Sequence, residues 1–341
     1  MAMAPTTPFP FTSRKDNRFL ITGAKGFIGA WLTKILLERG DSPSILDIDT
    51  GFHRLSAILS EGQLQQVNFI QGDIAKHADL ERAVTENGIT HILHLAGVQV
   101  PGCAADPPHG AMVNVIGTLN VFEVARRRRD LVQRIVYASS AAVFGPEEFY
   151  GGVTVQEGAP LFPGTHYGVF KQCNEGNARV YFLNDGIPSV GIRPWAVYGV
   201  GRDIGISSGP TKAVKAAVLR RPYVIGFTGA VDLQYVRDTA QIFVDCAERD
   251  ISGAKVYTPR GDVVRVEEFI RVLEQVLPQA QGLITARGKP LPIAPDLDDS
   301  ALKHDLGHEL HTPLEEGIRE TANIFARLAE EGRLETHDLE S

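Results

Sequence analysis

The sequence predicts an α/β protein, a Rossmann-type doubly wound parallel sheet with a smaller C-terminal substrate-binding lobe. Two observations predict this fold class. Short apolar runs alternate with helical stretches, which is the βαβ order of a parallel sheet. A glycine-rich loop joins the first apolar run to the first helical stretch, as is typical of a dinucleotide site.

The predicted strands are short and bounded by turns, as expected of strands that are buried on both faces. They are residues 19–22, 44–47, 67–71, 91–95, 134–138 and 189–193. Apolar residues at helical spacing predict the crossover helices between them. These helices are residues 27–39, 78–86, 111–129 and 168–183.

After Gly199 the alternation becomes less regular. Helical spacing and short apolar runs still predict further elements there. The helices are residues 210–219, 266–277 and 314–330, the strands are 223–226 and 255–258, and residues 289–295 form a proline-rich loop. We interpret this half as a smaller lobe that is interleaved with the first.

Composition excludes several classes of protein. The 341 residues are 43% hydrophobic and carry a net charge of -7, which disfavours a nucleic-acid partner. The sequence has no apolar run of about 18 residues, so we expect no membrane partner and a cytoplasmic location. Neither the three cysteines nor His304, His308 and His311 have the spacing of a metal site, so we expect no metal ion.

The glycine loop is the first part of a predicted cofactor site. Gly23, Gly26 and Gly29 would let backbone N–H groups approach a pyrophosphate at the start of the helix from Phe27. Asp47 ends the second predicted strand, where a carboxylate accepts ribose hydroxyls.

Charge around the ribose bears on which dinucleotide binds. Asp47 would repel a 2′-phosphate, which favours NAD over NADP, although Lys25 and Arg54 weaken that preference. Asp73, after the third strand, is placed to accept from the adenine amino group, or else is an ordinary turn aspartate. Gly97, after the fourth strand, would permit close approach of the cofactor.

Tyr167 and Lys171 stand four residues apart, so they share one face of a helix. A free tyrosine has a pKa of about 10, and a nearby cation lowers that pKa by favouring the phenolate. Tyr167 is therefore a candidate acid or base near neutral pH.

In these motifs the chain resembles the extended short-chain dehydrogenase/reductases, the NAD-dependent epimerase/dehydratase family, over roughly residues 18–326. The resemblance rests on the three loop glycines, Asp47, Gly72-Asp73, His94 to Gly97, Asn114 to Thr118, Ser139 to Gly145, Tyr167 to Lys171 and Arg193-Pro194. It implies that Ser140 hydrogen-bonds the substrate oxygen, Tyr167 exchanges its proton, and Lys171 holds the nicotinamide ribose while lowering the pKa of Tyr167.

We expect NAD to contact the residues that these motifs contribute to the cofactor site. They are Gly23, Gly26, Phe27, Ile28, Gly29, Asp47, Asp73, Ile74, Leu95, Ala96, Gly97, Asn114, Ala138, Tyr167, Lys171 and Pro194. The predicted regions are a disordered leader at 1–17, an NAD-binding domain at 18–198 with return segments from the C-terminal half, and a substrate-binding lobe at 199–341.

Three departures from the family pattern narrow the reaction. Ala141 and Ala142 stand where the family's dehydratases place an Asp-Glu pair, so dehydration is not expected. Sugar-nucleotide members usually carry Asn at the position of Ala196, and an Arg that clamps a diphosphate just before the strand that here contains Tyr235. Both are missing here, which favours a smaller hydroxylated substrate such as a free sugar, an aldonate or a uronate.

Candidate substrate contacts follow the predicted strands. Arg202 and the backbone at Ser208, which resembles a helix N-cap, could receive a carboxylate, or could serve only to cap the helix. Gln99, Ser139 and His166 are further candidates to line the pocket.

Three functions remain open on the sequence. The first is a dehydrogenase that oxidises one hydroxyl-bearing carbon of a sugar-like molecule and releases NADH. The second is a sugar or nucleotide-sugar epimerase that retains NAD and returns the hydride to the other face. The third is an NAD-binding sensor or scaffold without turnover. The resemblance also implies a homodimer formed through helices 111–129 and 168–183, where Gly168 and Gly176 would permit close packing.

Overall fold

The structure is a computed structural model that describes residues 17–340. The disordered leader predicted at 1–17 lies outside the described residues, except for Asn17. The main sheet has seven strands in the order β10-β6-β5-β4-β1-β2-β3, all parallel. They are β1 (Phe19–Thr22), β2 (Ser44–Asp47), β3 (Asn68–Gln71), β4 (His91–His94), β5 (Arg134–Ala138), β6 (Ser189–Ile192) and β10 (Ala254–Tyr257).

The fold class predicted from the sequence is confirmed, and the six predicted strands of the first half lie within one residue of their observed bounds. The strand expected at 255–258 is present, but it does not lie in the smaller lobe as predicted. It is β10, which comes from the C-terminal half but pairs with β6 at the edge of the main sheet. The division between two domains after residue 198 stays a prediction.

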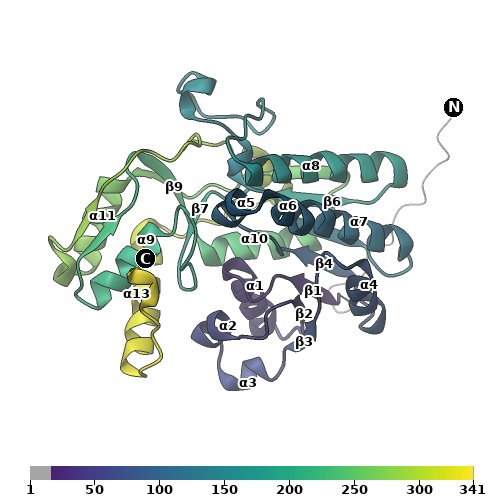
Figure 1. The fold of residues 1–341 in the computed structure, drawn as a ribbon, viewed down its shortest axis with the longest axis horizontal. Helices are drawn as coiled ribbons and strands as arrows, with labels where there is room; N and C mark the ends of the chain where they lie inside the picture. Colours follow the sequence, from purple (N-terminus) through teal and green to yellow (C-terminus); the bar gives the residue numbers. More distant parts are fainter. Residues whose placement is uncertain (1–16, 341) are drawn as a thin grey trace.

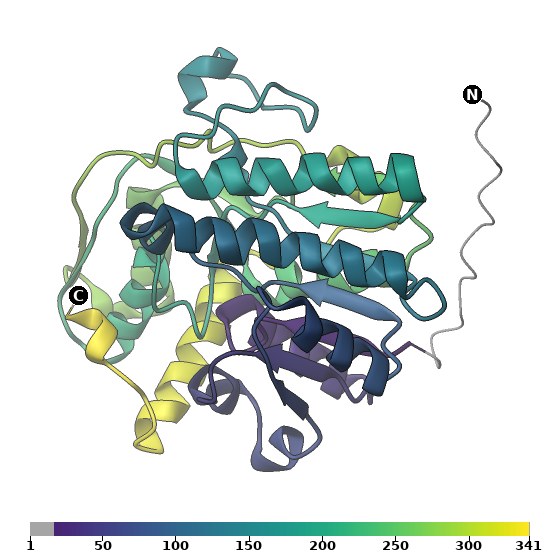
Figure 2. The ribbon, with the colours of Figure 1, turned by 45° about the vertical axis from the view of Figure 1, so that its right-hand side comes forward.

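Helices cover both faces of this sheet (Figures 1 and 2). Ile21 packs with α1 (Phe27–Glu38) and α10 (Val236–Glu248) in one apolar core, whereas the preceding Leu20 packs with α4 (His77–Glu86) and α7 (Gly117–Arg127) in the other. This alternation follows from the period of two along a strand. α8 (His166–Asp185) lies beside α7 on the second face.

The segment between β4 and β5 differs from the single helix expected at 111–129. It consists of α5 (Val100–Ala105), α6 (Pro107–Ala111), a π-helix η2 (Met112–Ile116) and α7. Within η2, the carbonyl of Asn114 accepts hydrogen bonds from the side chains of Thr118 and Asn174. A wide turn of this kind often occurs at functional sites, and this one lies next to the main cleft.

The remaining elements form the smaller lobe at the left of Figure 1 and the short connections around the cleft. Its sheets are β11-β9-β7, from β7 (Ala196–Tyr198), β9 (Ala230–Tyr235) and β11 (Asp262–Arg265), and the pair β8 (Tyr223–Ile225) and β12 (Ile284–Ala286). Its helices are α9 (Gly209–Val218), α11 (Val266–Val276) and α13 (Leu314–Glu330). The helix α12 (Ser300–Leu306) lies instead at the edge of the main sheet, where Asp305 accepts a hydrogen bond from Tyr257 of β10. The short helices are α2 (His53–Ile58), α3 (Glu61–Leu64), η3 (Ala141–Val143), η4 (Glu147–Tyr150), η5 (Pro278–Ala280) and η6 (His337–Leu339). None of the helices described here is long and apolar enough to cross a membrane.

Candidate active site

A cleft of about 600 Å³ runs along the carboxyl ends of β1, β2, β4 and β5. This is the edge where open α/β sheets bind their ligands. Most of the predicted cofactor residues line it, namely Gly23, Gly26, Phe27, Ile28, Gly29, Asp47, Asp73, Ile74, Leu95, Ala96, Gly97, Ala138, Tyr167, Lys171 and Pro194.

The glycine loop brings the start of α1 to the cleft. A Cβ atom on Gly23, whose φ is +69°, would lie 2.6 Å from the backbone nitrogen of Ala96, so no other residue fits there. α1 has no side-chain cap at Gly26 and no acidic residue in its first turn. Its first N–H groups are therefore free to bind an anion such as a pyrophosphate.

At the end of β2, Asp47 organises the loop that would surround an adenosine ribose. Its two oxygens accept hydrogen bonds from the backbone nitrogens of Lys25 and Asp49, each at 3.1 Å. The side chain of Lys25 turns away, because its Nζ atom donates to the carbonyl of Asp49 and lies 4.0 Å and 3.6 Å from the ring centroids of Phe52 and Phe69. The ammonium of Lys25 is therefore engaged within this loop, and the Asp47 carboxylate lines the cleft at the end of β2.

Ser140, Tyr167 and Lys171 converge at the other end of the cleft. Ser140 follows β5, and its hydroxyl, which accepts a hydrogen bond from the Ala142 nitrogen at 3.1 Å, lies close enough to Tyr167 to lower the pKa of that phenol. α8 begins after Thr165, which caps the helix by accepting from the Gly168 nitrogen at 3.0 Å. Lys171 donates to the Ala138 carbonyl at 2.7 Å, and its Nζ atom lies 5.4 Å from the ring centroid of Tyr167.

The electrostatics of this group differ from the expectation for Lys171. Burial raises the pKa of Tyr167 above its usual value, against the opposing effects of the Ser140 hydrogen bond and the charge of Arg202. Burial also lowers the pKa of Lys171 to about 8. In this structure Arg202, rather than Lys171, is the cation that lowers the pKa of Tyr167.

Two predicted site residues, His166 and Asn114, do not line the cleft, and a third, Ser139, lines it but is engaged within the protein. His166 is exposed, stacks on Phe170 and does not line the cleft. Ser139 reaches the cleft wall, but its hydroxyl donates to the buried carboxylate of Glu175, so it holds the strand end rather than a ligand. Asn114 is fully buried and lies behind the cleft.

Asn114 supports the cofactor loop from behind. Its amide nitrogen donates to the carbonyls of Val98, at 3.1 Å, and Gly110, at 3.0 Å, and so ties the loop after β4 to α6. The sequence motif could not separate this supporting role from direct contact, because both place the residue at the same position along the helix. Ser208 stands at the N-cap of α9, but its side chain makes no capping hydrogen bond.

Sequence reasoning missed the residues that form the apolar wall of the substrate end. They are Met112, Trp195, Val197, Ile206 and Ile293, and they come from four separate segments of the chain. Trp195 directly follows Pro194, so its position after the sixth strand was the one available signal. The others are apolar residues like many in the core, and only the tertiary structure brings them together.

Comparison with known proteins identifies the family. The sequence profile of the NAD dependent epimerase/dehydratase family matches residues 19–257, which is well over half of the chain. This chain is a member of the NAD dependent epimerase/dehydratase family. The match covers every strand of the main sheet and both ends of the cleft.

Several relatives of known activity match nearly the whole chain. A UDP-glucose 4-epimerase of Mycolicibacterium smegmatis is 29% identical over 90% of this chain and 98% of its own length. UDP-glucuronic acid decarboxylase 1 of Danio rerio is 26% identical over 94% of this chain and 75% of its own. A solved UDP-glucose 4-epimerase of Thermus thermophilus, in complex with NAD, has a TM-score of 0.76 and 25% identity over 90% of this chain and 98% of its own.

As a member of the epimerase/dehydratase family, the chain uses NAD as its cofactor. Its residues fit that group. The uncapped N-terminus of α1 suits the pyrophosphate, Asp47 suits the ribose hydroxyls, and Lys171 stands where the nicotinamide ribose would lie.

Proposed function

We propose that this member of the epimerase/dehydratase family transfers a hydride at a carbinol carbon of a small sugar or sugar acid. The observation that carries the proposal is the convergence of Ser140, Tyr167 and Lys171 at one end of the cofactor cleft. When bound, NAD supplies the hydride acceptor. The net oxidation converts the alcohol and NAD⁺ to a ketone or lactone, NADH and one proton.

Each of the three side chains has a separate task in this proposal. Tyr167 takes the proton of the reacting hydroxyl. Ser140, which lies beside Tyr167, donates to the same oxygen as negative charge builds on it. Lys171 is oriented by the Ala138 carbonyl and would hold the nicotinamide ribose, while the charge of Arg202 favours the Tyr167 phenolate.

The same site argues against dehydration. Ala141 and Ala142 line the cleft directly after Ser140 and carry no group that could remove or add a proton. Elimination of water needs both an acid and a base near the reacting carbons. We therefore favour a reaction that begins and ends with hydride and proton transfer.

The second candidate is an epimerase that retains its cofactor. Two observations favour it: the UDP-glucose 4-epimerases among the relatives, and the fact that the same Ser, Tyr and Lys serve both reactions. An epimerase would carry NAD through gel filtration and produce no net NADH. A dehydrogenase would release NADH in proportion to substrate consumed.

We also propose that the protein is a homodimer formed through α7 and α8. An apolar stripe on α8 supports this proposal: Val169, Val180 and Leu183 are 47%, 47% and 56% exposed. Gly168 does not contribute to it, because it is buried against Ala142 within the subunit, whereas Gly176 is open. The cytoplasmic location stays a prediction.

Turnover of a panel of sugars and sugar acids with NAD and with NADP, followed by NADH or NADPH absorbance, tests the proposed function. Tyr167→Phe removes the phenolic hydroxyl and should lower kcat by about 10² to 10⁴-fold. NAD affinity should change little, because the ring and Lys171 remain. An undiminished rate in Tyr167→Phe would remove the proposed mechanism.

A further inference from the structure

The loop between β7 and α9 places a cation at the substrate end of the cleft. Arg202 lines the cleft, and its guanidinium carbon lies 5.9 Å from the ring centroid of Phe27. One terminal nitrogen donates to the hydroxyl of Ser207 at 3.1 Å. The Nε atom is buried and has no hydrogen-bond partner.

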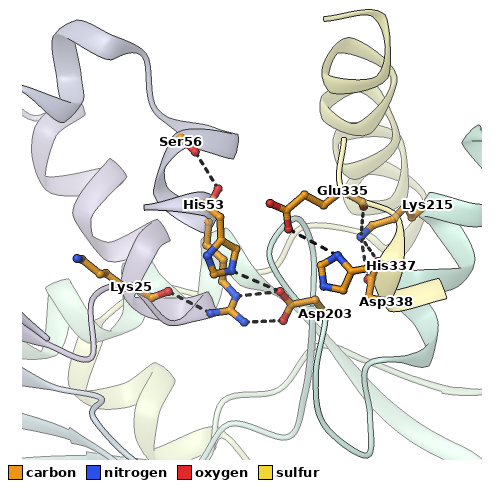
Figure 3. Close-up of polar contacts among 9 residues, drawn as sticks. Lys25, His53, Ser56, Asp203, Lys215, Glu335, His337 and Asp338 are labelled. Atoms are coloured by element: carbon orange, nitrogen blue, oxygen red, sulfur yellow. Dashed lines mark hydrogen bonds and ion pairs between the residues drawn. The ribbon is translucent and has the colours of Figure 1, made fainter. Parts of the chain in front are cut away.

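The adjacent acid, Asp203, forms its ion pair with another arginine. Asp203 accepts two hydrogen bonds from Arg54 on α2, from Nε at 3.1 Å and from Nη2 at 2.8 Å. Figure 3 shows the Asp203 carboxylate directed toward α2, with His53 on the same side. Arg54 also donates to the Lys25 carbonyl at 3.2 Å, which ties this loop to the cofactor side.

Arg202 is therefore a half-buried cation that lines the cleft, with a buried Nε atom and no carboxylate in an ion pair with it. Within residues 17–340, no Asp or Glu forms an ion pair with it. Burying a charge is costly unless another charge or a set of hydrogen bonds compensates. A guanidinium without an ion-pair partner next to a reaction site can bind an anionic group of the substrate.

Two more polar groups lie beside the guanidinium. A Cβ atom on Gly205 would lie 2.7 Å from Oε1 of Gln99 and 2.9 Å from Nη2 of Arg202, so these side chains meet over this glycine. Gly205 has a φ of +111°, which other residues rarely adopt. The charge of Arg202 acts on Tyr167 and also interacts with Asp203 and Arg54, so the guanidinium lies between the Tyr167 hydroxyl and α2.

The number of Lys and Arg side chains in the cleft that remain available to a ligand indicates which kind of anion can bind there. Lys25 and Arg54 line the cleft at the ribose end, where Asp49 and Asp203 engage them, and Lys171 is bound to the Ala138 carbonyl. Of the Lys and Arg side chains that line the cleft in the described part of the chain, this leaves one guanidinium near the apolar wall. One bidentate cation matches the single charge of a carboxylate, whereas a diphosphate carries at least two charges.

We propose that Arg202 anchors a carboxylate of the substrate, with Ser207 and Gln99 beside it, so that the substrate is a small hydroxy acid. This inference rests on the proposed function for the reacting hydroxyl and adds the chemical class of the molecule that carries it. It disfavours neutral sugars and nucleoside-diphosphate sugars as substrates.

A binding experiment tests this assignment separately from catalysis. The full chain is loaded with NADH, which leaves no hydride acceptor, and is titrated calorimetrically with matched acid and neutral probes. The pairs are D-glucuronate with D-glucose, D-gluconate with D-glucitol, and L-lactate with L-lactamide, and UDP-glucose is tested alongside. Because nothing is oxidised, a failure of the proposed reaction does not affect this readout.

We expect at least one acid to bind wild-type protein about 10- to 100-fold more tightly than its neutral partner. Arg202→Gln should abolish this difference, and Arg202→Lys should retain part of it because the charge remains but the planar fork is lost. Arg265→Gln, which removes an arginine that is 68% exposed and outside the cleft, is the matched control and should bind like wild type.

Three results would overturn the assignment. They are the absence of any preference for an acid in wild type, a preference that survives in Arg202→Gln, and tighter binding of UDP-glucose than of every acid. Thermal unfolding of each variant checks that it is folded. If Arg202→Gln does not fold, a preference in Arg202→Lys equal to that of wild type would equally count against the assignment.

Discussion

At the scale of single residues, the site depends on charges that are held out of water. Lys171 is buried among the segments that should bind the nicotinamide, and desolvation lowers its pKa from 10.5 to about 8. Tyr167 is subject to the opposite shift, because burial disfavours its anion. A substrate and cofactor that bring charge into the cleft would therefore change both groups.

In the cofactor-free protein at neutral pH, the buried ammonium of Lys171 should lower the free energy of unfolding. Since its folded pKa lies below its unfolded pKa, the unfolded chain binds more protons between about pH 8 and 10.5, and the cost of burial disappears as the pH rises through that window. We expect Lys171→Met to be inactive but more stable than wild type by about 1 to 3 kcal/mol at pH 7. The advantage should vanish near pH 10.5.

Urea unfolding of the cofactor-free protein at pH 7 and at pH 10 measures this effect. The control is Lys255→Met, which removes an exposed lysine of β10 and should not change stability in this pH-dependent way. Equal stability of Lys171→Met and wild type at both values would show that the buried ammonium carries no such cost.

At the scale of elements, one close contact sets the distance between the helix that carries Tyr167 and the turn that follows Ser140. A Cβ atom on Gly168 would lie 2.2 Å from the carbonyl oxygen of Ala142 in η3. No side chain fits there without a shift of α8 or η3. The packing of these two elements therefore determines whether Ser140 and Tyr167 can share one oxygen.

Gly168→Ala should push α8 away from η3. We expect a loss of stability of about 1 to 3 kcal/mol and a fall in kcat of roughly 100-fold, because overpacking costs energy and a misplaced catalytic group is ineffective. The matched control is Gly62→Ala in the helix α3, where an added Cβ meets no atom within 4 Å. Steady-state kinetics and urea unfolding give both quantities, and wild-type kcat in Gly168→Ala would contradict this account.

At the scale of the whole molecule, α8 presents an apolar stripe to solvent. Val169, Cys173, Gly176, Val180 and Leu183 follow one another at spacings of four and three residues, as in a helix that packs against other helices. Met112 and Ile116 of η2, on the segment that leads into the neighbouring α7, are 49% and 39% exposed. Figure 2 shows α7 and α8 side by side on one face of the sheet, where two copies could form a bundle of four helices.

Replacing Val180 and Leu183 by Asp should convert a dimer into a monomer, because the charges would lie in the apolar interface. Sedimentation velocity at micromolar concentration distinguishes the two states. Val224→Asp, at a 45% exposed position of β8 in the smaller lobe, is the control and should leave the dimer intact. A wild-type protein that sediments as a monomer would refute the proposed interface.

The sequence by itself determined the strand segments of the first half, the cofactor loop and the positions of Ser140, Tyr167 and Lys171 along the chain. These depend on local patterns, since apolar runs define strands and a helical spacing of four residues places two side chains on one face. Only the tertiary structure decided that β10 completes the main sheet, that His166 faces solvent and that Glu175 engages Ser139. It also showed that Asp203 pairs with Arg54, whereas its neighbour Arg202 hydrogen-bonds Ser207. The sequence could not show this, because charge pairing depends on segments that are distant in the chain.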